Sequence, residues 1–91
     1  MSGQFTVKLT PAFARDLEKL PLKNQEYVLA AIAVLENNPF GPPPGVKKLK
    51  GKGIGQWRLR IGNYRVRYDI IQKDVVLYRV RHRKDIYRDQ T

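Results

Sequence analysis

The chain has 91 residues, enough for one domain spanning residues 1–91 with a small hydrophobic core. It has no cysteine, which excludes a disulfide framework, cysteine-based zinc sites and thiol catalysis. Its net charge of +10 at pH 7 is larger than solubility requires and indicates a polyanionic partner. No apolar run approaches the ~20 residues of a membrane helix and no signal peptide is evident, so we expect a cytoplasmic protein without a membrane partner.

The excess charge lies in the second half of the chain. Residues 1–44 contain four basic and four acidic residues, whereas residues 45–91 contain fourteen basic and four acidic ones. Many of these basic residues alternate with apolar ones, and a period of two is the period of a β-strand. The pattern therefore predicts a sheet with one apolar face and one cationic face.

In chain order, the first half begins with a predicted strand and a predicted helix. Apolar and polar residues alternate from Phe5 to Leu9, which indicates a short strand. Thr10 suits the N-cap of a helix and Pro11 its first position, where the missing N–H of proline costs no hydrogen bond. This helix ends near Pro21. Its apolar stripe consists of Phe13, Leu17 and Leu20.

A second helix is predicted from about Leu22 to Asn37, which makes a helical hairpin with the first. Residues 38–45 contain four prolines and two glycines, so they form a loop. Residues 47–53 are basic and contain glycine, which indicates a second loop. This loop is either simply solvated or in contact with a phosphate backbone. The apolar stripe of the second helix is Val28, Ile32 and Leu35, with Leu29 and Ala33 beside it.

Three strands are predicted in the basic half, over residues 56–61, 63–71 and 75–83. Gly62 and Asn63 form a tight hairpin turn between the first two. The order β-α-α-β-β-β predicts an α+β domain, in which the helical hairpin packs on a mostly antiparallel, twisted sheet.

Strict alternation assigns the side chains of the last two strands to faces. On the middle strand, Arg65, Arg67 and Asp69 face away from the core. We interpret Arg67 and Arg79 as solvated charges, and Trp57 and the strand tyrosines as core residues. The middle strand directs Tyr64, Val66, Tyr68 and Ile70 to the core; the last strand has Val76, Tyr78 and Val80 on one face and Val75, Leu77, Arg79, Arg81 and Arg83 on the other.

The sequence shows no convergent carboxylates for a metal-dependent nuclease, and its single histidine, His82, excludes a multi-histidine metal site. RNA cleavage would therefore proceed without a metal or other cofactor. Such a reaction needs cations to stabilise the charge on the phosphate and groups to move protons. Arginine suits the first task and not the second, because its pKa lies above about 12. Tyr87, His82 and the lysines remain as candidates for proton transfer.

Six short segments together resemble those of a known protein family. No single segment is specific, and the resemblance depends on their order and spacing. They extend from the start of the first helix to the tail and include an arginine-rich strand and a His-Arg…Tyr ending. The segments are Thr10-Pro11-Ala12, Leu17-Glu18-Lys19-Leu20, Leu35-Glu36-Asn37-Asn38-Pro39, Lys48-Leu49-Lys50-Gly51, residues 57–66 (WRLRIGNYRV) and His82-Arg83-Lys84-Asp85-Ile86-Tyr87.

With these segments the chain resembles the RelE/ParE toxin superfamily of type II toxin–antitoxin systems. The resemblance implies a microbial RNase-like fold and a cognate RelB-like antitoxin, which we expect to be acidic and amphipathic. It also implies the activity of RelE-type members, which are endoribonucleases that cut mRNA in the ribosomal A site and so inhibit translation.

The resemblance also implies site residues. Arg58 and Arg60, where the prototype RelE has lysines, would clamp the phosphate electrostatically, and Arg65 and Arg83 would stabilise the phosphate and the leaving group. Tyr87 would take the 2′-OH proton. The reserve acid is His82. The expected docking residues for the ribosome or the antitoxin are Lys47, Lys48, Lys50, Lys52 and Arg81.

Two alternatives share the same sequence features. A ParE-like DNA gyrase inhibitor would have this fold without nuclease activity. A basic RNA- or ribosome-binding domain would have the charge without any activity.

Overall fold

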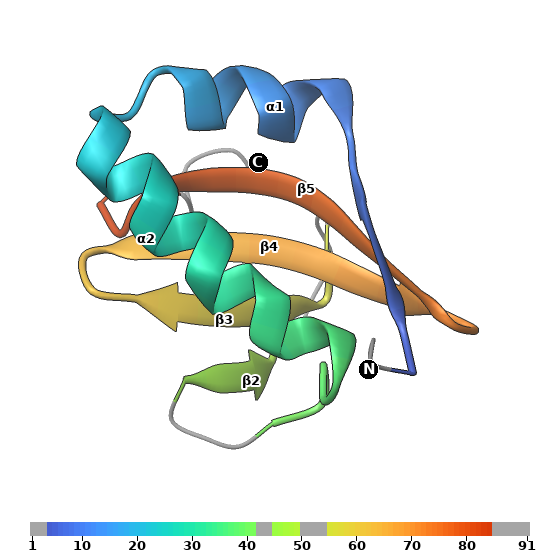
Figure 1. The fold of residues 1–91 in the computed structure, drawn as a ribbon. Coiled ribbons are helices and arrows are strands. Elements are labelled where there is room, and N and C mark those ends of the chain that lie inside the picture. Colours follow the sequence, from blue (N-terminus) through green and yellow to red (C-terminus); the bar gives the residue numbers. More distant parts are fainter. Residues whose placement is uncertain (1–3, 42–44, 50–54, 85–91) are drawn as a thin grey trace.

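The computed structural model describes residues 4–41, 45–49 and 55–84 (Figure 1). The α+β class is confirmed, because two helices pack on a five-stranded mixed sheet in this part of the chain. No helix among the described residues is long and apolar enough to span a bilayer. The elements are β1 (Thr6–Leu9), α1 (Pro11–Glu18), α2 (Leu22–Ala33), a 3-10 turn (Val34–Glu36), β2 (Val46–Lys48), β3 (Trp57–Ile61), β4 (Tyr64–Ile71) and β5 (Asp74–His82).

The strand order in the sheet is β1-β5-β4-β3-β2. β1 runs parallel to β5, and the remaining neighbours are antiparallel. The edge strand β2 pairs with β3, with Val46 opposite Leu59. Two of its three residues, Lys47 and Lys48, lie in a segment that was predicted to be a loop. That prediction is wrong for Lys47 and Lys48, because backbone pairing with β3 extends this short, lysine-rich segment into a strand.

The predicted start of α1 is confirmed. The Thr10 hydroxyl accepts a hydrogen bond from the Phe13 N–H at 3.2 Å, and Pro11 occupies the first helical position. The same hydroxyl donates to the Leu77 carbonyl of β5 at 2.9 Å. One side chain therefore both caps the helix and attaches its start to the sheet, and Figure 1 shows α1 lying along β5.

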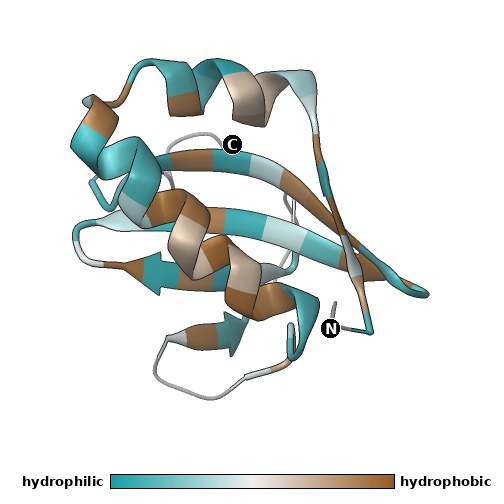
Figure 2. Ribbon diagram, viewed as in Figure 1, coloured by the Kyte–Doolittle hydropathy of each residue, from teal (hydrophilic) through white to brown (hydrophobic). Residues whose placement is uncertain are grey.

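The second helix ends earlier than predicted. α2 stops at Ala33 and tightens into the 3-10 turn, which ends at Glu36. The predicted stripe is buried, whereas Leu29 beside it is 47 % exposed. Leu22 and Tyr27 of α2 are exposed as well, so this helix has apolar surface outside the core, and Figure 2 shows hydrophobic residues along its second half.

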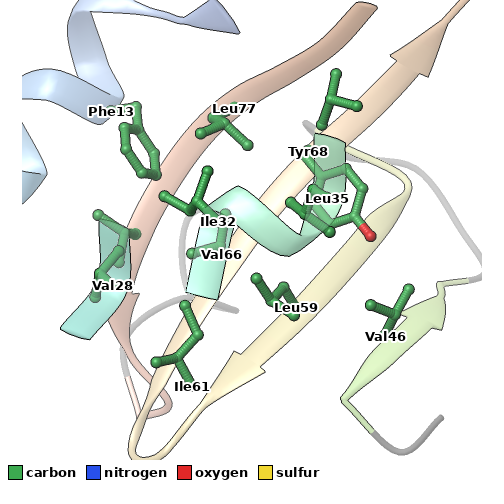
Figure 3. Packing of buried hydrophobic residues seen from close by; sticks show 12 residues of the cluster. Phe13, Val28, Ile32, Leu35, Val46, Leu59, Ile61, Val66, Tyr68 and Leu77 are labelled. Carbon is green, nitrogen blue, oxygen red and sulfur yellow. The ribbon is translucent and has the colours of Figure 1, made fainter. Parts of the chain in front are cut away.

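The core lies between the two helices and one face of the sheet (Figure 3). Ile32 and Leu35 of the α2 segment point toward Val66 and Tyr68 of β4, and Phe13 of α1 lies next to Leu77. The buried hydrophobic residues are Phe13, Val28, Ile32, Leu35, Val46, Leu59, Ile61, Val66, Tyr68, Val75, Leu77 and Val80.

A bulge in β5 changes the faces of this strand. Arg67 pairs with Arg79 and Tyr68 pairs with Leu77, so Tyr78 is an extra residue on β5. Beyond it the alternation is shifted by one, and Val80 joins Leu77 in the core. The prediction that Leu77 shares a face with Arg79 is therefore wrong, because it assumed an unbroken period of two.

Candidate functional site

The face of the sheet opposite the helices carries basic side chains in register across neighbouring strands. The first cation row crosses four strands and the second crosses three. Like charges directly opposite each other destabilise a sheet. This arrangement therefore does not serve stability, and its positive potential attracts an anionic ligand. The first cation row is Lys47, Arg58, Arg67 and Arg79, and the second cation row is Arg60, Arg65 and Arg81.

Two of these arginines are held by backbone carbonyls. Arg67 is only 4 % exposed, and its Nε and Nη2 donate to the Gly55 carbonyl at 3.0 and 2.5 Å. The prediction of a solvated charge at Arg67 is therefore wrong. Arg65 is 8 % exposed, and its Nη1 donates to the carbonyls of Gly62 and Tyr64 at 2.8 and 2.9 Å. These bonds fix the two guanidinium groups before any ligand arrives.

The carbonyl that holds Arg67 depends on a glycine that sequence reasoning missed. Gly55 has φ +79°, a conformation that other L-residues rarely adopt. A Cβ at this position would lie 2.8 Å from the Tyr68 backbone nitrogen. Only glycine therefore brings this carbonyl close enough to β4 to accept from Arg67.

An acidic residue of α1 reaches the β5 end of both cation rows. The Asp16 carboxylate accepts from Nε and Nη2 of Arg79 at 2.7 and 3.1 Å and lies 3.9 Å from Nε of Arg81. It also accepts from the Val80 N–H at 3.2 Å. Arg79 is thus ion-paired, and the prediction that it is a solvated charge is wrong.

Sequence reasoning did not select Asp16, although a signal was present. Asp16 follows Phe13 by three residues and precedes Leu20 by four, so it lies within the apolar stripe of α1. An acidic residue within such a stripe indicates a buried partner, because an unpaired buried charge is costly.

Tyr78, the bulge residue, does not lie in the core as predicted. Burial, the negative charge of Asp69 and a hydrogen bond to that carboxylate raise the pKa of Tyr78 above its usual value. Asp69 also accepts from the Gln56 N–H at 2.8 Å. Tyr78 therefore stays protonated at neutral pH and is poorly suited to act as a base.

The structure places His82 on the other side of the sheet from the arginines. It pairs with Tyr64, and the two rings meet edge to face with centroids 6.1 Å apart. Its Nδ1 accepts from the Lys84 N–H at 3.2 Å. His82 is thus not brought together with Arg65 and Arg81, and this position does not favour its expected role as reserve acid.

The remaining predicted residues fall into three groups. Arg83 is exposed just past β5, and its N–H donates to the Asn63 carbonyl at 2.8 Å, which extends the β4–β5 pairing beyond His82. Lys48 lies over the Trp57 ring, 5.8 Å from its centroid, and is thus outside both cation rows. Outside the described residues lie Lys50, Lys52 and Tyr87.

No group of three potential metal ligands occurs among the residues that the structure describes. The observed site is therefore a cationic sheet face whose central arginines are fixed by backbone carbonyls and by Asp16.

Residues 7–87 match the family described as "ParE toxin of type II toxin-antitoxin system, parDE". The chain belongs to the RelE/ParE superfamily. It is 36 % identical over 88 residues to Toxin RelG of Mycobacterium tuberculosis, covering 92 % of this chain and 97 % of the relative. The resemblance inferred from the sequence is thereby confirmed, and the chain is a toxin of a type II toxin–antitoxin system.

Solved structures of this superfamily share the fold. The RelBE2 toxin–antitoxin complex of M. tuberculosis aligns with a TM-score of 0.74 and 33 % identity, covering 87 % of this chain and 98 % of that chain. The archaeal RelE–RelB complex of Pyrococcus horikoshii aligns with a TM-score of 0.71 and 27 % identity, covering 88 % and 96 %. The predicted RelE-type fold is therefore confirmed.

Proposed function

We propose that this toxin is a ribosome-dependent, metal-independent endoribonuclease that cuts mRNA in the A site and so inhibits translation in the cytoplasm. The observation that carries the proposal is the second cation row, in which Arg60, Arg65 and Arg81 lie side by side on three strands. Because Arg65 is already fixed by two backbone carbonyls, little reorganisation is needed when negative charge develops on a phosphate.

In the proposed reaction the RNA supplies its own nucleophile. The 2′-oxygen forms a bond to the adjacent phosphorus while the bond from phosphorus to the 5′-oxygen breaks. The products are a 2′,3′-cyclic phosphate and a 5′-hydroxyl. Tyr87 takes the proton of the 2′-OH, and solvent protonates the leaving 5′-oxygen.

The arginines of the cationic face stabilise the reacting phosphate. Arg58 and Arg60 are neighbours along β3 and act as electrostatic clamps on the RNA. Arg65 and Arg83 contact the phosphate oxygens and the leaving group. Since arginine stays charged at any physiological pH, these contacts persist throughout the reaction. His82 is left out of this site because its side chain lies on the helix side of the sheet.

A cognate RelB-like antitoxin is the proposed protein partner, and complexes of RelB with RelE are among the similar structures. Exposed apolar residues of the α2 segment, including Leu22, Tyr27 and Val34, lie on the helix side of the sheet. The cation rows lie on the opposite side. An acidic, amphipathic antitoxin segment that covers both surfaces must therefore pass around an edge of the sheet. Docking on the ribosome would use Lys47, Lys48, Lys50 and Lys52, and Arg81, which was expected to dock as well, would contact the RNA phosphate beside Arg65.

The alternative is inhibition of DNA gyrase. The matching family description names ParE, whereas the similar proteins carry RelG and RelE names. Those names and the in-register arginines favour the nuclease. Intact mRNA together with gyrase poisoning would establish the alternative instead.

The decisive experiment maps mRNA 5′ ends in a translating extract containing the toxin. Tyr87→Phe should lower the cleavage rate by about 10²–10⁴-fold, because the proton acceptor is lost. Arg83→Ala should lower it by about 10²–10³-fold, because a charge that stabilises the transition state is lost.

Lys84→Ala is the matched control, since Lys84 is exposed next to Arg83 and has no proposed role. It should cleave at close to the wild-type rate. Circular dichroism should show the same fold in all three variants. Wild-type cleavage by Tyr87→Phe and Arg83→Ala would rule out the proposed site.

A further inference from the structure

We propose that Asp16 is a positioning residue that fixes Arg79 and Arg81 at the β5 end of both cation rows. The activity test of this inference rests on the proposed nuclease function. The Asp16 carboxylate is 6 % exposed and belongs to a helix rather than to the cationic sheet face.

The position of Asp16 follows from where β1 ends. The parallel pairing of β1 with β5 stops at Leu9 and Leu77, so the next part of β5 pairs with no strand on that side among the described residues. α1 follows this edge, and its Asp16 accepts the Val80 N–H at 3.2 Å. The carboxylate thus takes the place of a strand carbonyl directly after the Tyr78 bulge.

The two arginines relate to this carboxylate differently. Arg79 donates to it through both Nε and Nη2, a two-point contact that fixes the plane of the guanidinium. The Nε of Arg81 lies 3.9 Å from the same carboxylate, so the negative charge of Asp16 attracts Arg81 over a longer distance. Arg79 is therefore held in place by Asp16, and Arg81 is positioned to contact a phosphate beside Arg65.

The charge of Asp16 has opposite effects on binding and on positioning. Its negative charge lowers the positive potential of the cationic face, which weakens general attraction for RNA. The same charge holds the β5 arginines in place. Neutralising Asp16 should thus leave RNA affinity equal or higher while it lowers the rate of the chemical step. Loss of folded protein alone would lower the apparent kcat at unchanged KM, so kcat is calculated per molecule of folded protein, whose fraction circular dichroism measures.

The test compares Asp16→Asn with Asp74→Asn in the cleavage assay. The asparagine keeps the shape of Asp16 and an oxygen that can accept the Val80 N–H. Asp74 is a matched control, because it is also an acidic residue paired with a cation, Lys8 at 3.2 Å, and lies at the start of β5 away from the cation rows.

For Asp16→Asn we expect kcat about ten- to a hundredfold below wild type with KM no higher than wild type. Asp74→Asn should keep the wild-type kcat. A wild-type kcat in Asp16→Asn, or a parallel loss in both variants, would overturn the inference. If Asp16→Asn does not fold, Asp16→Leu combined with Arg79→Met replaces the buried ion pair by apolar groups, and the same fall in kcat is expected.

A second readout does not depend on cleavage. Side-chain ¹⁵N relaxation of the full-length protein should show rigid Nε–H groups for Arg79 and Arg81 in the wild type and mobile ones in Asp16→Asn. Unchanged mobility would refute the positioning role. If the wild type itself does not cut mRNA, the proposed function fails, whereas this measurement still decides the role of Asp16.

Discussion

The two faces of the sheet are made by the same strands and differ in almost every physical property. The helix side buries neutral side chains, and Leu59 and Val66 pair across β3 and β4 in its centre. The opposite side places Arg60 against Arg65 and Arg58 against Arg67 in the same two strands. One face supplies the stability that the other face, with its opposed cations, reduces.

The cationic face is nevertheless well ordered, because its arginines are not simply solvated. Arg67 donates to the Gly55 carbonyl, Arg65 to the Gly62 and Tyr64 carbonyls, and Arg79 to Asp16. Neutral acceptors hold two of the three, so the face keeps most of its positive charge for a ligand. A sheet face can thus be both rigid and strongly cationic.

Replacing a residue of the helix side should have the largest effect on stability. Leu59→Ala removes a buried side chain from the centre of the core, and we expect the free energy of unfolding to fall by about 2–5 kcal/mol. Chemical denaturation measures this loss. Leu22→Ala is the control, since Leu22 is 76 % exposed, and it should lose less than about 0.5 kcal/mol. Equal losses in the two variants would contradict the assignment of the core.

Tyr68→Phe tests the polar contact within the helix side. The buried Tyr68 hydroxyl donates to the Pro39 carbonyl at 2.7 Å, so its removal should cost about 1–3 kcal/mol at pH 7. Burial also raises the pKa of Tyr68 above its value in the unfolded chain.

This pKa shift predicts how the difference depends on pH. A raised pKa contributes stability that is complete below about pH 10, the unfolded value, and is lost as the pH rises above it. The stability gap between wild type and Tyr68→Phe should therefore shrink between pH 9 and pH 11. Denaturation curves across this range measure the gap, and a constant gap would refute the link to Tyr68.

Arg60→Gln should have the smallest effect on stability and a clear effect on RNA binding. Arg60 is exposed and lies opposite Arg65, so removing its charge should leave stability unchanged or raise it by about 0.2–1 kcal/mol. The slope of log affinity for single-stranded RNA against log salt should decrease by about 0.7, corresponding to one lost phosphate contact. An unchanged slope would show that Arg60 does not contact the RNA.

Local patterns predicted much of this molecule. The capping by Thr10, the buried stripe of α2 and the hairpin at Gly62 depend on neighbouring residues, and the structure confirms them. The arginine-bearing face of β3 and β4 also follows from the period of two. The site residue Tyr87 stays a prediction, since it lies outside the described residues.

The sequence alone therefore determined a basic half with alternating arginines, two helices and a RelE/ParE-type order of elements. The tertiary structure decided which arginines share a row, because the Tyr78 bulge shifts the register of β5 relative to β4. It also decided that Asp16, 63 residues before Arg79, accepts a hydrogen bond from that arginine. Periodicity describes only local geometry, whereas register shifts and buried ion pairs depend on contacts between segments far apart in the chain.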